Sequence, residues 1–346
     1  MLGPTPDELA ARARADLRAG LPVAVGPVLM GSVETLGAER LAAMGALGPL
    51  TVAVTGRRAA TLRARVYDGD LARLAVPGDA GAAWLRAVAD PARDLDTPLK
   101  GPLGARRDGD AAPWRAGLAL AKAAHLLPAV VGVEAPAPSG VTRVGPSLPA
   151  PAPWVADVAA ARLPTALAGP GRLHVFREGL GGESHCAVEV GRVDRAAPVL
   201  VRLHSACFTG DVLGSTRCDC GPQLHAALGA MRAGGGVLLY LAQEGRGIGL
   251  ANKMRAYDLQ DQGFDTVEAN HRLGFEDDER DFRLGATLLR RLGIATIRLM
   301  TNNPRKLAMM AAQGIAVAER VPLHVGRSPE NAAYLDAKRL RSGHLA

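Results

Sequence analysis

Residues 197–243, APVLVRLHSACFTGDVLGSTRCDCGPQLHAALGAMRAGGGVLLYLAQ, decide the fold of this chain. The two ends of the run, 197–205 and 235–243, are short and apolar, which is typical of buried strands. Between them, residues 222–234 repeat apolar side chains at helical spacing and end in glycine, which stops helices. A strand, a helix and a second strand in this order predict a βαβ unit with two parallel strands.

The same alternation continues toward the C-terminus. Helices are predicted over 252–263, 280–294 and 304–314, the last with proline at its first position and glycine at its end. Strands are predicted over 297–303 and 316–323. The second part of the chain is therefore predicted to be an α/β domain.

The first part of the chain also mixes helical and strand patterns. Helices are predicted over 6–19 and 114–127, and strands over 21–30, 49–56 and 128–133. A smaller α/β domain is therefore predicted to precede the larger one.

A proline-rich stretch separates the two parts. Residues 134–154, EAPAPSGVTRVGPSLPAPAPW, hold six prolines and little periodic pattern, which predicts an extended linker. The predicted division is a first domain over 1–133, the linker over 134–154 and a second domain over 155–346.

Composition limits the possible partners. The chain has 346 residues, a formal net charge of +7 and only 3% aromatic residues, too few for an aromatic platform that stacks single-stranded nucleic acid. The positive charge is spread along the chain and is mostly arginine, which suits a small phosphorylated ligand as well as a nucleic acid. The first residues lack the apolar core of a signal peptide, and no apolar run has the length of a membrane span. We therefore expect a cytoplasmic protein that binds neither membranes nor nucleic acid.

Three of the four cysteines, Cys207, Cys218 and Cys220, lie close together in the sequence. In an extended segment residues i and i+2 face the same way, so Cys218 and Cys220 can both reach one ion. Three ligands and an open position are typical of a catalytic zinc site, whereas His204 could close a four-ligand structural site. Packed or oxidised thiols are a third interpretation. Cys186 lies in a strand-like run and is interpreted as a buried small apolar residue.

Three other clusters could carry chemistry. Residues 243–253, QEGRGIGLANK, combine glycines with cations that can hold phosphate, or they form only a tight turn. Residues 274–282, GFEDDERDF, are acids that favour the start of a helix. Residues 301–306, TNNPRK, lie between a strand and a helix, where anions bind readily. A lone histidine, His125, is interpreted as a core or boundary residue.

Together these motifs resemble GTP cyclohydrolase II, the first enzyme of riboflavin biosynthesis. The resemblance covers roughly residues 170–345 and includes the tail YLDAKRLRSGHL. It implies a mixed-sheet α/β catalytic domain that hydrolyses GTP and opens its imidazole ring. Formate and pyrophosphate would be released, leaving 2,5-diamino-6-(5-phosphoribosylamino)pyrimidin-4-one. The resemblance further implies one zinc ion per subunit, magnesium with the triphosphate, and a homodimer.

The resemblance also assigns roles to residues. Zinc, with a water that attacks C8, would be held by Cys207, Cys218 and Cys220. The residues that would contact GTP are Arg202, Leu203, His204, Ser205, Ala206, Gln223, Glu244, Gly245, Arg246, Thr266, Thr301 and Lys306. The resemblance makes Asp278 the proton acceptor, Arg280 a nucleophile toward the α-phosphate, and Tyr257 the tyrosine that favours complete ring opening. Because a guanidinium stays protonated, stabilisation of the phosphoryl transition state is the alternative role of Arg280.

One position departs from the family pattern. The family usually reads H-S-E-C where this chain has H-S-A-C, so Ala206 replaces a glutamate. One alternative is therefore a relative that stops at a formamide product or opens another nucleotide. A more remote alternative is a structural-zinc protein that binds nucleic acid.

The first part of the chain faintly resembles a dihydroxybutanone phosphate synthase domain. It lacks the acidic metal motif and the histidine motif of that domain. We therefore expect residues 1–133 to be a degenerate, non-catalytic domain that serves dimerisation or support.

Overall fold

The structure is a computed structural model of the chain, and it describes residues 3–147, 155–179 and 182–331. None of the helices in these ranges combines the length and apolar character that crossing a membrane requires. Both sheets mix parallel and antiparallel pairs, so the predicted mixed α/β fold is confirmed.

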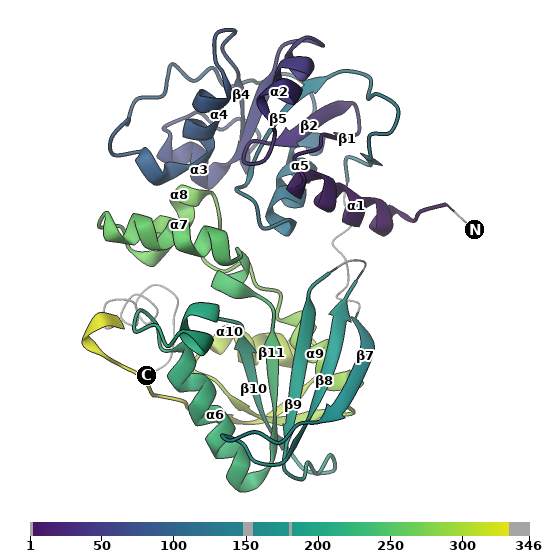
Figure 1. Cartoon of the computed structure of the whole chain (residues 1–346), viewed down its shortest axis with the longest axis vertical. Helices are drawn as coiled ribbons and strands as arrows, with labels where there is room; N and C mark the ends of the chain where they lie inside the picture. The colour runs from purple at the N-terminus through teal and green to yellow at the C-terminus, as the bar shows by residue number, and fades with distance from the viewer. Residues whose placement is uncertain (1–2, 148–154, 180–181, 332–346) are drawn as a thin grey trace. The chain divides into compact units, whose positions relative to one another are not determined.

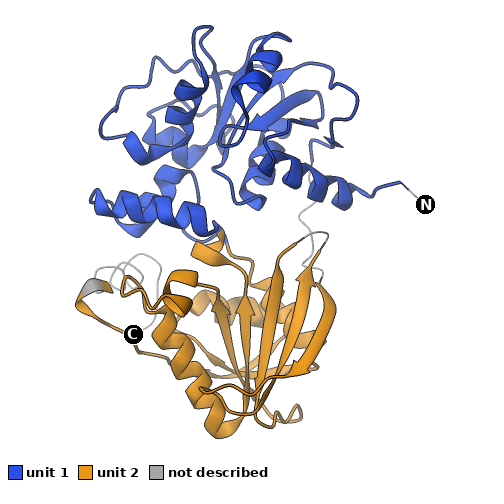
Figure 2. Cartoon of the chain, viewed as in Figure 1, with its two compact units in different colours: residues 1–150, 248–279 blue, residues 151–247, 280–346 orange. Residues whose placement is uncertain are grey.

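The chain divides into two compact units, which Figure 2 shows in different colours. Unit 1 contains residues 1–150 and 248–279, and unit 2 contains residues 151–247 and 280–346. Residues 248–279 lie inside the sequence of the predicted second domain, yet they pack with the first part of the chain.

The predicted linker also differs from the compact division. Residues 134–147 belong to unit 1, where the two-residue strand β6 (Arg143–Val144) pairs in parallel with residues 24–25. The rest of the linker, 148–154, lies outside the described residues.

Unit 1 is built on one six-stranded sheet. Its strands are β1 (Val23–Val25), β2 (Val28–Ser32), β3 (Thr51–Thr55), β4 (Leu71–Ala75), β5 (Ala129–Glu134) and β6, in the spatial order β4-β3-β5-β2-β1-β6. Its helices are α1 (Pro6–Arg18), α2 (Ala38–Gly45), α3 (Gly56–Thr61), α4 (Ala82–Ala89), α5 (Ala112–Ala123), α7 (Leu250–Asp261) and α8 (Thr266–Leu273), with a 3-10 turn at Pro91–Arg93. The strand predicted over 21–30 is a hairpin, because Gly26 adopts a positive φ of 57° between β1 and β2.

Two apolar clusters form the core of unit 1. One contains Trp114 and Leu120 of α5 together with Leu17 of α1. The other joins the sheet to α7 and α8, which contribute buried side chains such as Leu259 and Leu273. The two later helices are therefore part of the hydrophobic core of unit 1.

Unit 2 is built on a seven-stranded sheet (Figure 1). Its strands are β7 (Val155–Arg162), β8 (Gly171–Glu178), β9 (Ser184–Val190), β10 (Val199–Ser205), β11 (Gly236–Leu241), β12 (Thr296–Met300) and β13 (Ala316–Val321), in the spatial order β13-β12-β10-β11-β9-β8-β7. Its helices are α6 (Cys220–Gly234), α9 (Arg283–Arg291) and α10 (Pro304–Ala312), with a π-helical turn at Phe208–Val212 and 3-10 turns at Glu244–Gly247 and Pro329–Asn331. The predicted βαβ unit is present, since β10 and β11 pair in parallel and α6 lies between them in the chain.

Alternation along β10 and β11 assigns their side chains to two cores. Leu203 and Leu239 pack with α9 and α10, whereas Leu200 and Leu238 pack on the side of Met231 in α6. By the two-residue period of a strand, even-numbered side chains of β10 share the face toward α6.

Candidate functional site

The predicted site residues of unit 2 gather where three neighbouring parallel strands end. β10 pairs in parallel with both β11 and β12, so the carboxyl ends of all three lie at one edge of the sheet. The segments that follow these ends begin at Ala206, Ala242 and Thr301, and they contain the cysteine cluster, the glycine-rich turn and TNNPRK. Ligands of open α/β sheets bind at such carboxyl ends.

The three cysteines form a cluster that fits a metal ion. Cys207 follows β10, Cys218 lies in the next loop and Cys220 is the first residue of α6, and their sulfur atoms lie within 4.8 Å of one another. The Sγ atoms of Cys207 and Cys218 are 3.6 Å apart. Tetrahedral zinc with Zn–S bonds of about 2.3 Å requires roughly 3.8 Å between two sulfurs. The spacing therefore suits zinc and is far too long for a disulfide bond.

A glycine makes room for this cluster. A Cβ atom on Gly210 would lie 2.8 Å from the Sγ of Cys218 and 3.1 Å from the Sγ of Cys207. A neighbouring glycine, Gly221, would place a Cβ atom 2.4 Å from the carbonyl oxygen of Gly210. Both positions are closed to any side chain, so the turn wraps tightly around the three thiols.

The predicted alternative in which His204 closes a four-ligand site is wrong. Its Nε2 atom lies 3.0 Å from the Oδ2 atom of Asp211, and its ring stacks on Tyr240 at 5.6 Å. The metal-ligand group found among the described residues contains the three cysteines without this histidine. Among the described residues, the group that could hold a metal therefore consists of the three cysteines.

A buried arginine lies beside the cysteine cluster. Arg202 donates from Nη1 to the carbonyl of Met300 at 3.0 Å and from Nη2 to the Oε1 atom of Gln223. The amide of Gln223 in turn donates to Asp219. The Nε of Arg202 has no hydrogen-bond partner among the described residues, so a donor remains for a ligand. Burial lowers the pKa of Arg202 to about 10, which still leaves it charged at neutral pH.

Two further cations flank one aromatic ring. Arg280 and Lys306 lie 4.9 Å and 5.2 Å from the centre of the Phe282 ring. Arg280 also donates to the Ser205 hydroxyl at 3.2 Å, and Lys306 donates to the carbonyl of Leu203 at 2.8 Å. The structure therefore brings cations predicted from distant motifs to the end of β10.

The glycine-rich turn has an unusual backbone. Gly245 and Arg246 both have φ of 63°, a left-handed conformation that an arginine rarely adopts. Glu244 accepts a hydrogen bond from the backbone N–H of Phe208 at 2.6 Å. This contact connects the glycine-rich turn to the turn that carries the cysteines.

Three predicted substrate contacts differ in exposure. The side chain of Leu203 is buried in the core, so a ligand could reach only its backbone. The hydroxyl of Thr301 is also buried and accepts a hydrogen bond from the N–H of Asn303 at 3.0 Å. Ala206 is half-buried, and its N–H donates to the carbonyl of Leu241 at 2.7 Å.

The remaining predicted residues lie in unit 1. Tyr257 is on α7, where the Nζ of Lys253 lies 5.6 Å from its ring centre. Thr266 opens α8, and its hydroxyl accepts a hydrogen bond from Gln260 at 3.3 Å. Asp278 follows α8 in the acidic segment.

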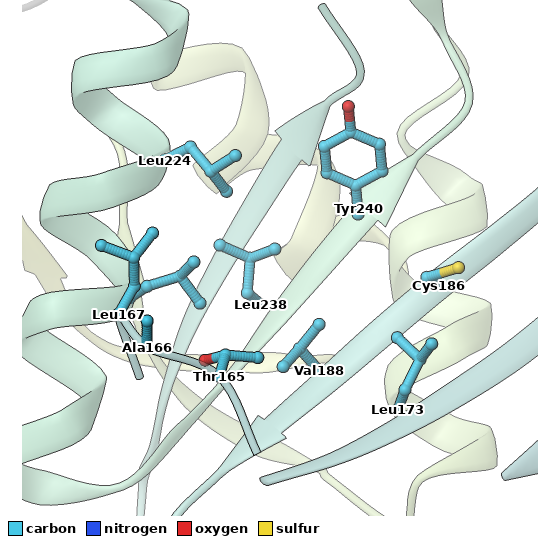
Figure 3. Close-up of a pocket in the computed structure, with 10 residues that line it drawn as sticks. Thr165, Ala166, Leu167, Leu173, Cys186, Val188, Leu224, Leu238 and Tyr240 are labelled. Carbon is cyan, nitrogen blue, oxygen red and sulfur yellow. The ribbon is translucent and has the colours of Figure 1, made fainter. Parts of the chain in front are cut away.

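An apolar cavity of about 480 Å³ lies on the α6 side of the sheet of unit 2 (Figure 3). Its lining includes Leu224 of α6, Val188 of β9 and the ring of Tyr240. Cys186, which also lines the cavity, is half-buried, and burial raises the pKa of its thiol. The sequence predicted a buried small apolar residue, whereas Cys186 is half-buried and lies among the apolar side chains that line the cavity.

Burial and neighbouring groups shift other pKa values in the site. Burial lowers the pKa of His204, so this ring is neutral at pH 7. Burial, followed by the charge of Asp211, raises the pKa of Tyr240. The hydrogen bond with the Cys207 thiol raises the pKa of Cys218.

Several residues of the site were not predicted from the sequence. Gly210 and Phe282 were missed, although both lie within the quoted motifs. Asp211 was also missed, and its signal was available because a carboxylate four residues after Cys207 can accept from the backbone of that turn.

The fold and the site define a class of protein. It is an α/β protein in which three cysteines that could hold a metal lie at the same sheet edge as buried cations. The family model of GTP cyclohydrolase II matches residues 156–322. GTP cyclohydrolase-2 of Azospirillum brasilense is 41% identical over 358 aligned residues, which cover 96% of this chain and 93% of that protein. The chain belongs to the GTP cyclohydrolase II family, and it is an enzyme of that family.

Other similar proteins differ in length. GTP cyclohydrolase-2 of Azotobacter vinelandii is 57% identical over 192 residues, covering 55% of this chain and 92% of that protein. A solved structure, a two-domain 3,4-dihydroxy-2-butanone 4-phosphate synthase from A. baumannii, aligns with 91% of this chain and 99% of that chain. Its TM-score of 0.28 and identity of 15% are too low to support a conclusion about fold or activity.

Proposed function

We propose that this chain is a zinc-dependent GTP cyclohydrolase that releases formate and pyrophosphate from GTP and forms 2,5-diamino-6-(5-phosphoribosylamino)pyrimidin-4-one. The observation that carries the proposal is the cluster of Cys207, Cys218 and Cys220 at the strand ends where Arg280 and Lys306 also lie. The cysteines suit a metal, and the two cations suit phosphates. The proposed reaction needs both, because it opens the imidazole ring of GTP and also releases pyrophosphate.

The three cysteines would hold the zinc ion. When bound, zinc supplies Lewis-acid activation of the water that attacks C8 of the purine. Two observations support a catalytic site: the spacing of 3.6 Å between two sulfurs, and a ligand group that contains three cysteines and no fourth ligand among the described residues.

Buried cations would hold the triphosphate, and magnesium would accompany it. Lys306 is 6% exposed, and its neighbour Arg305 is exposed. We expect Lys306→Ala to raise KM for GTP about tenfold or more, because charge-assisted hydrogen bonds contribute about 1.5–3 kcal/mol. Arg305→Ala is the matched control and should leave KM unchanged.

Proton transfer and the phosphoryl step are assigned by the resemblance. Asp278 would accept the proton, and Tyr257 would favour complete ring opening. Arg280 would either attack the α-phosphate or stabilise its transition state. Its contacts with Ser205 and Phe282 fix a charged guanidinium, and this favours the electrostatic role.

The deciding experiment measures formate and pyrophosphate in the same samples after incubation with GTP, Mg²⁺ and Zn²⁺. We expect both products from the wild-type chain and no formate from Cys220→Ser. Formate release that persists in Cys220→Ser would overturn the zinc assignment. A formylated product would instead support the alternative of incomplete ring opening that Ala206 suggests.

We further propose that the first part of the chain is a non-catalytic support for α7 and α8. Both ends of this helical pair meet it closely: a Cβ atom on Gly249 would lie 2.8 Å from the Cβ of His125, and one on Gly274 would lie 2.9 Å from Thr55 Oγ1 and Pro128 Cγ.

Polar contacts support the same role. Thr55 donates to the carbonyl of Gly274 at 2.8 Å in a buried position, and Lys122 pairs with Glu279 at 2.6 Å. Arg255 of α7 pairs with Glu34 at 2.9 Å. Tyr257 lies on α7, Thr266 lies on α8 and Asp278 follows α8. Their positions would therefore depend on the first part of the chain.

We also propose that the enzyme is a cytoplasmic homodimer that does not bind nucleic acid.

A further inference from the structure

Asp211 has a buried carboxylate that the proposed chemistry does not use. Its side chain is 3% exposed and accepts three hydrogen bonds. The donors are the backbone N–H of Cys207 at 3.0 Å, the hydroxyl of Tyr240 at 3.0 Å and the Nε2 of His204 at 3.0 Å. Because an ionised carboxylate only accepts, His204 must carry its proton on Nε2.

Two of these donors lie on neighbouring strands inside the sheet of unit 2. His204 of β10 and Tyr240 of β11 are directly paired residues in neighbouring parallel strands. Their rings stack with an interplanar angle of 18°. Figure 3 shows the ring of Tyr240 at the apolar cavity with its hydroxyl pointing away from Val188 and Leu238. Packing of the ring therefore fixes the direction in which the hydroxyl donates.

The third donor belongs to the backbone of a metal-ligand residue. Asp211 accepts from the N–H of Cys207, and its own N–H donates to the carbonyl of Cys207 at 2.7 Å. This reciprocal pair closes the turn that carries Cys207 and places Gly210 against the thiols. The carboxylate thus connects the cysteine turn to the two central strands.

We propose that Asp211 is a positioning residue of the metal site, which holds the Cys207 thiolate in the geometry that zinc requires. His204 and Tyr240 act through it, so His204 supports the metal site from outside the group of three cysteines. The inference rests on the proposed function, since it assumes that the three cysteines bind zinc.

The test compares metal binding by full-length wild-type protein and Asp211→Asn. Zinc affinity is measured by competition with a chromophoric chelator, and the geometry of the site is followed by the absorption bands of bound Co²⁺. We expect Asp211→Asn to lose about tenfold in zinc affinity and to shift the Co²⁺ bands, because outer groups that orient metal ligands contribute about 10–100-fold. In zinc-saturated protein, kcat should fall while KM for GTP changes little.

Two further variants keep the test decisive. Leu288→Ala removes a buried side chain of α9 and lowers stability without touching this network, so it should leave the Co²⁺ bands and zinc affinity unchanged. Tyr240→Phe removes one donor and keeps the packed ring, so it should show a smaller loss in the same direction even where Asp211→Asn fails to fold.

The outcomes separate this assignment from the proposed function. Wild-type affinity and unshifted bands in Asp211→Asn, or in Tyr240→Phe when Asp211→Asn does not fold, overturn the positioning role alone. Equal losses in Leu288→Ala also overturn it. A wild-type chain that binds neither ion overturns both this assignment and the zinc-dependent function.

Discussion

At the scale of single residues, the cysteine site depends on close packing, because the backbone beside the thiols leaves no room for an added side chain. Gly210 lies against the sulfurs of Cys207 and Cys218, and Asp211 fixes the same turn from the other side. The cysteines themselves could be predicted from their spacing. The role of Gly210 could not, because its close approach to the thiols is visible only once the turn has folded back on them. Asp211 was missed although its position four residues after Cys207 carried a signal.

We expect Gly210→Ala to abolish tight zinc binding. The added Cβ would lie 2.8 Å and 3.1 Å from two sulfurs, closer than atoms pack without displacement. Metal content of the purified protein, measured by elemental analysis, checks this. The control is Gly229→Ala, an exposed position inside α6 with open space around it, which should keep its zinc and gain about 1 kcal/mol of helix stability. Full zinc content in Gly210→Ala would contradict the geometry.

We expect Ala206→Glu to raise kcat/KM for GTP. The position is half-buried beside Cys207, and the family usually has glutamate there. A carboxylate that hydrogen-bonds the guanine would add about 1.5–3 kcal/mol, or roughly tenfold or more. Steady-state formate release checks the expectation, with Ala206→Gln as the uncharged control. An Ala206→Glu enzyme slower than the wild type would show that this chain has adapted to alanine.

At the scale of elements, alternation along strands explains which predictions were possible. The βαβ pattern of β10, α6 and β11 was predicted because its apolar runs and glycine stops are local signals. The short helix α8 was not, since it is only eight residues long and is held by contacts with residues far away in the sequence. Strand alternation then places Leu203 and His204 on opposite faces of the sheet, so Leu203 packs in the core while His204 stacks on Tyr240. The motif alone, read as consecutive residues, does not distinguish the two.

A buried ion group near α8 makes unit 1 sensitive to acid. Asp94 pairs with the buried Arg58 and with Lys100, and Arg272 of α8 lies 3.7 Å away. Burial raises the pKa of Asp94, but the hydrogen bonds and charges of Arg58 and Lys100 outweigh it and hold the pKa below its usual value. The stabilisation is therefore present above about pH 4, and it is lost as pH falls through the lowered pKa.

We expect Asp94→Asn to destabilise the protein by about 3 kcal/mol at pH 7, because it leaves buried cations without their counter-charge. Urea unfolding at pH 7 and at pH 3 measures the effect, and the difference from wild type should shrink at the lower pH. Asp96→Asn is the control: Asp96 pairs with Arg93 at 3.4 Å, but both side chains are more than 60% exposed. Such exposed pairs contribute about 0–1 kcal/mol. A pH-independent difference for Asp94→Asn would contradict the ionic origin.

At the scale of the whole molecule, the division into units was the feature hardest to predict. A proline-rich stretch suggested two consecutive domains, whereas residues 248–279 pack with the first part of the chain. The local sequence does not predict this packing, because the apolar side chains of α7 and α8 could pack equally well against the sheet of either unit. Contacts such as the one between Thr55 and Gly274 join residues 219 positions apart.

We expect the fragment 155–346 to lose most of its formate release, since removal of the first part of the chain exposes the apolar faces of α7 and α8. Hydrogen exchange over residues 250–273 should become fast, while exchange in β10 and β11 stays slow. Aligned relatives of about this length, such as that of Azotobacter vinelandii, provide the matched control. Full activity and slow exchange in the fragment would show that the first part of the chain is dispensable.

The insertion of residues 248–279 into unit 1 also bears on the order in which the protein can fold during synthesis. An N-terminal domain that is continuous in sequence can fold while the rest of the chain is still being made. Here the core of unit 1 includes Leu259, Leu273 and Phe275, which are synthesised after β11 of unit 2. The sheet of unit 2 includes β12 and β13, which are synthesised after residues 248–279. Neither core is complete until most of the chain has left the ribosome, so we expect both units to reach their final packing late in synthesis.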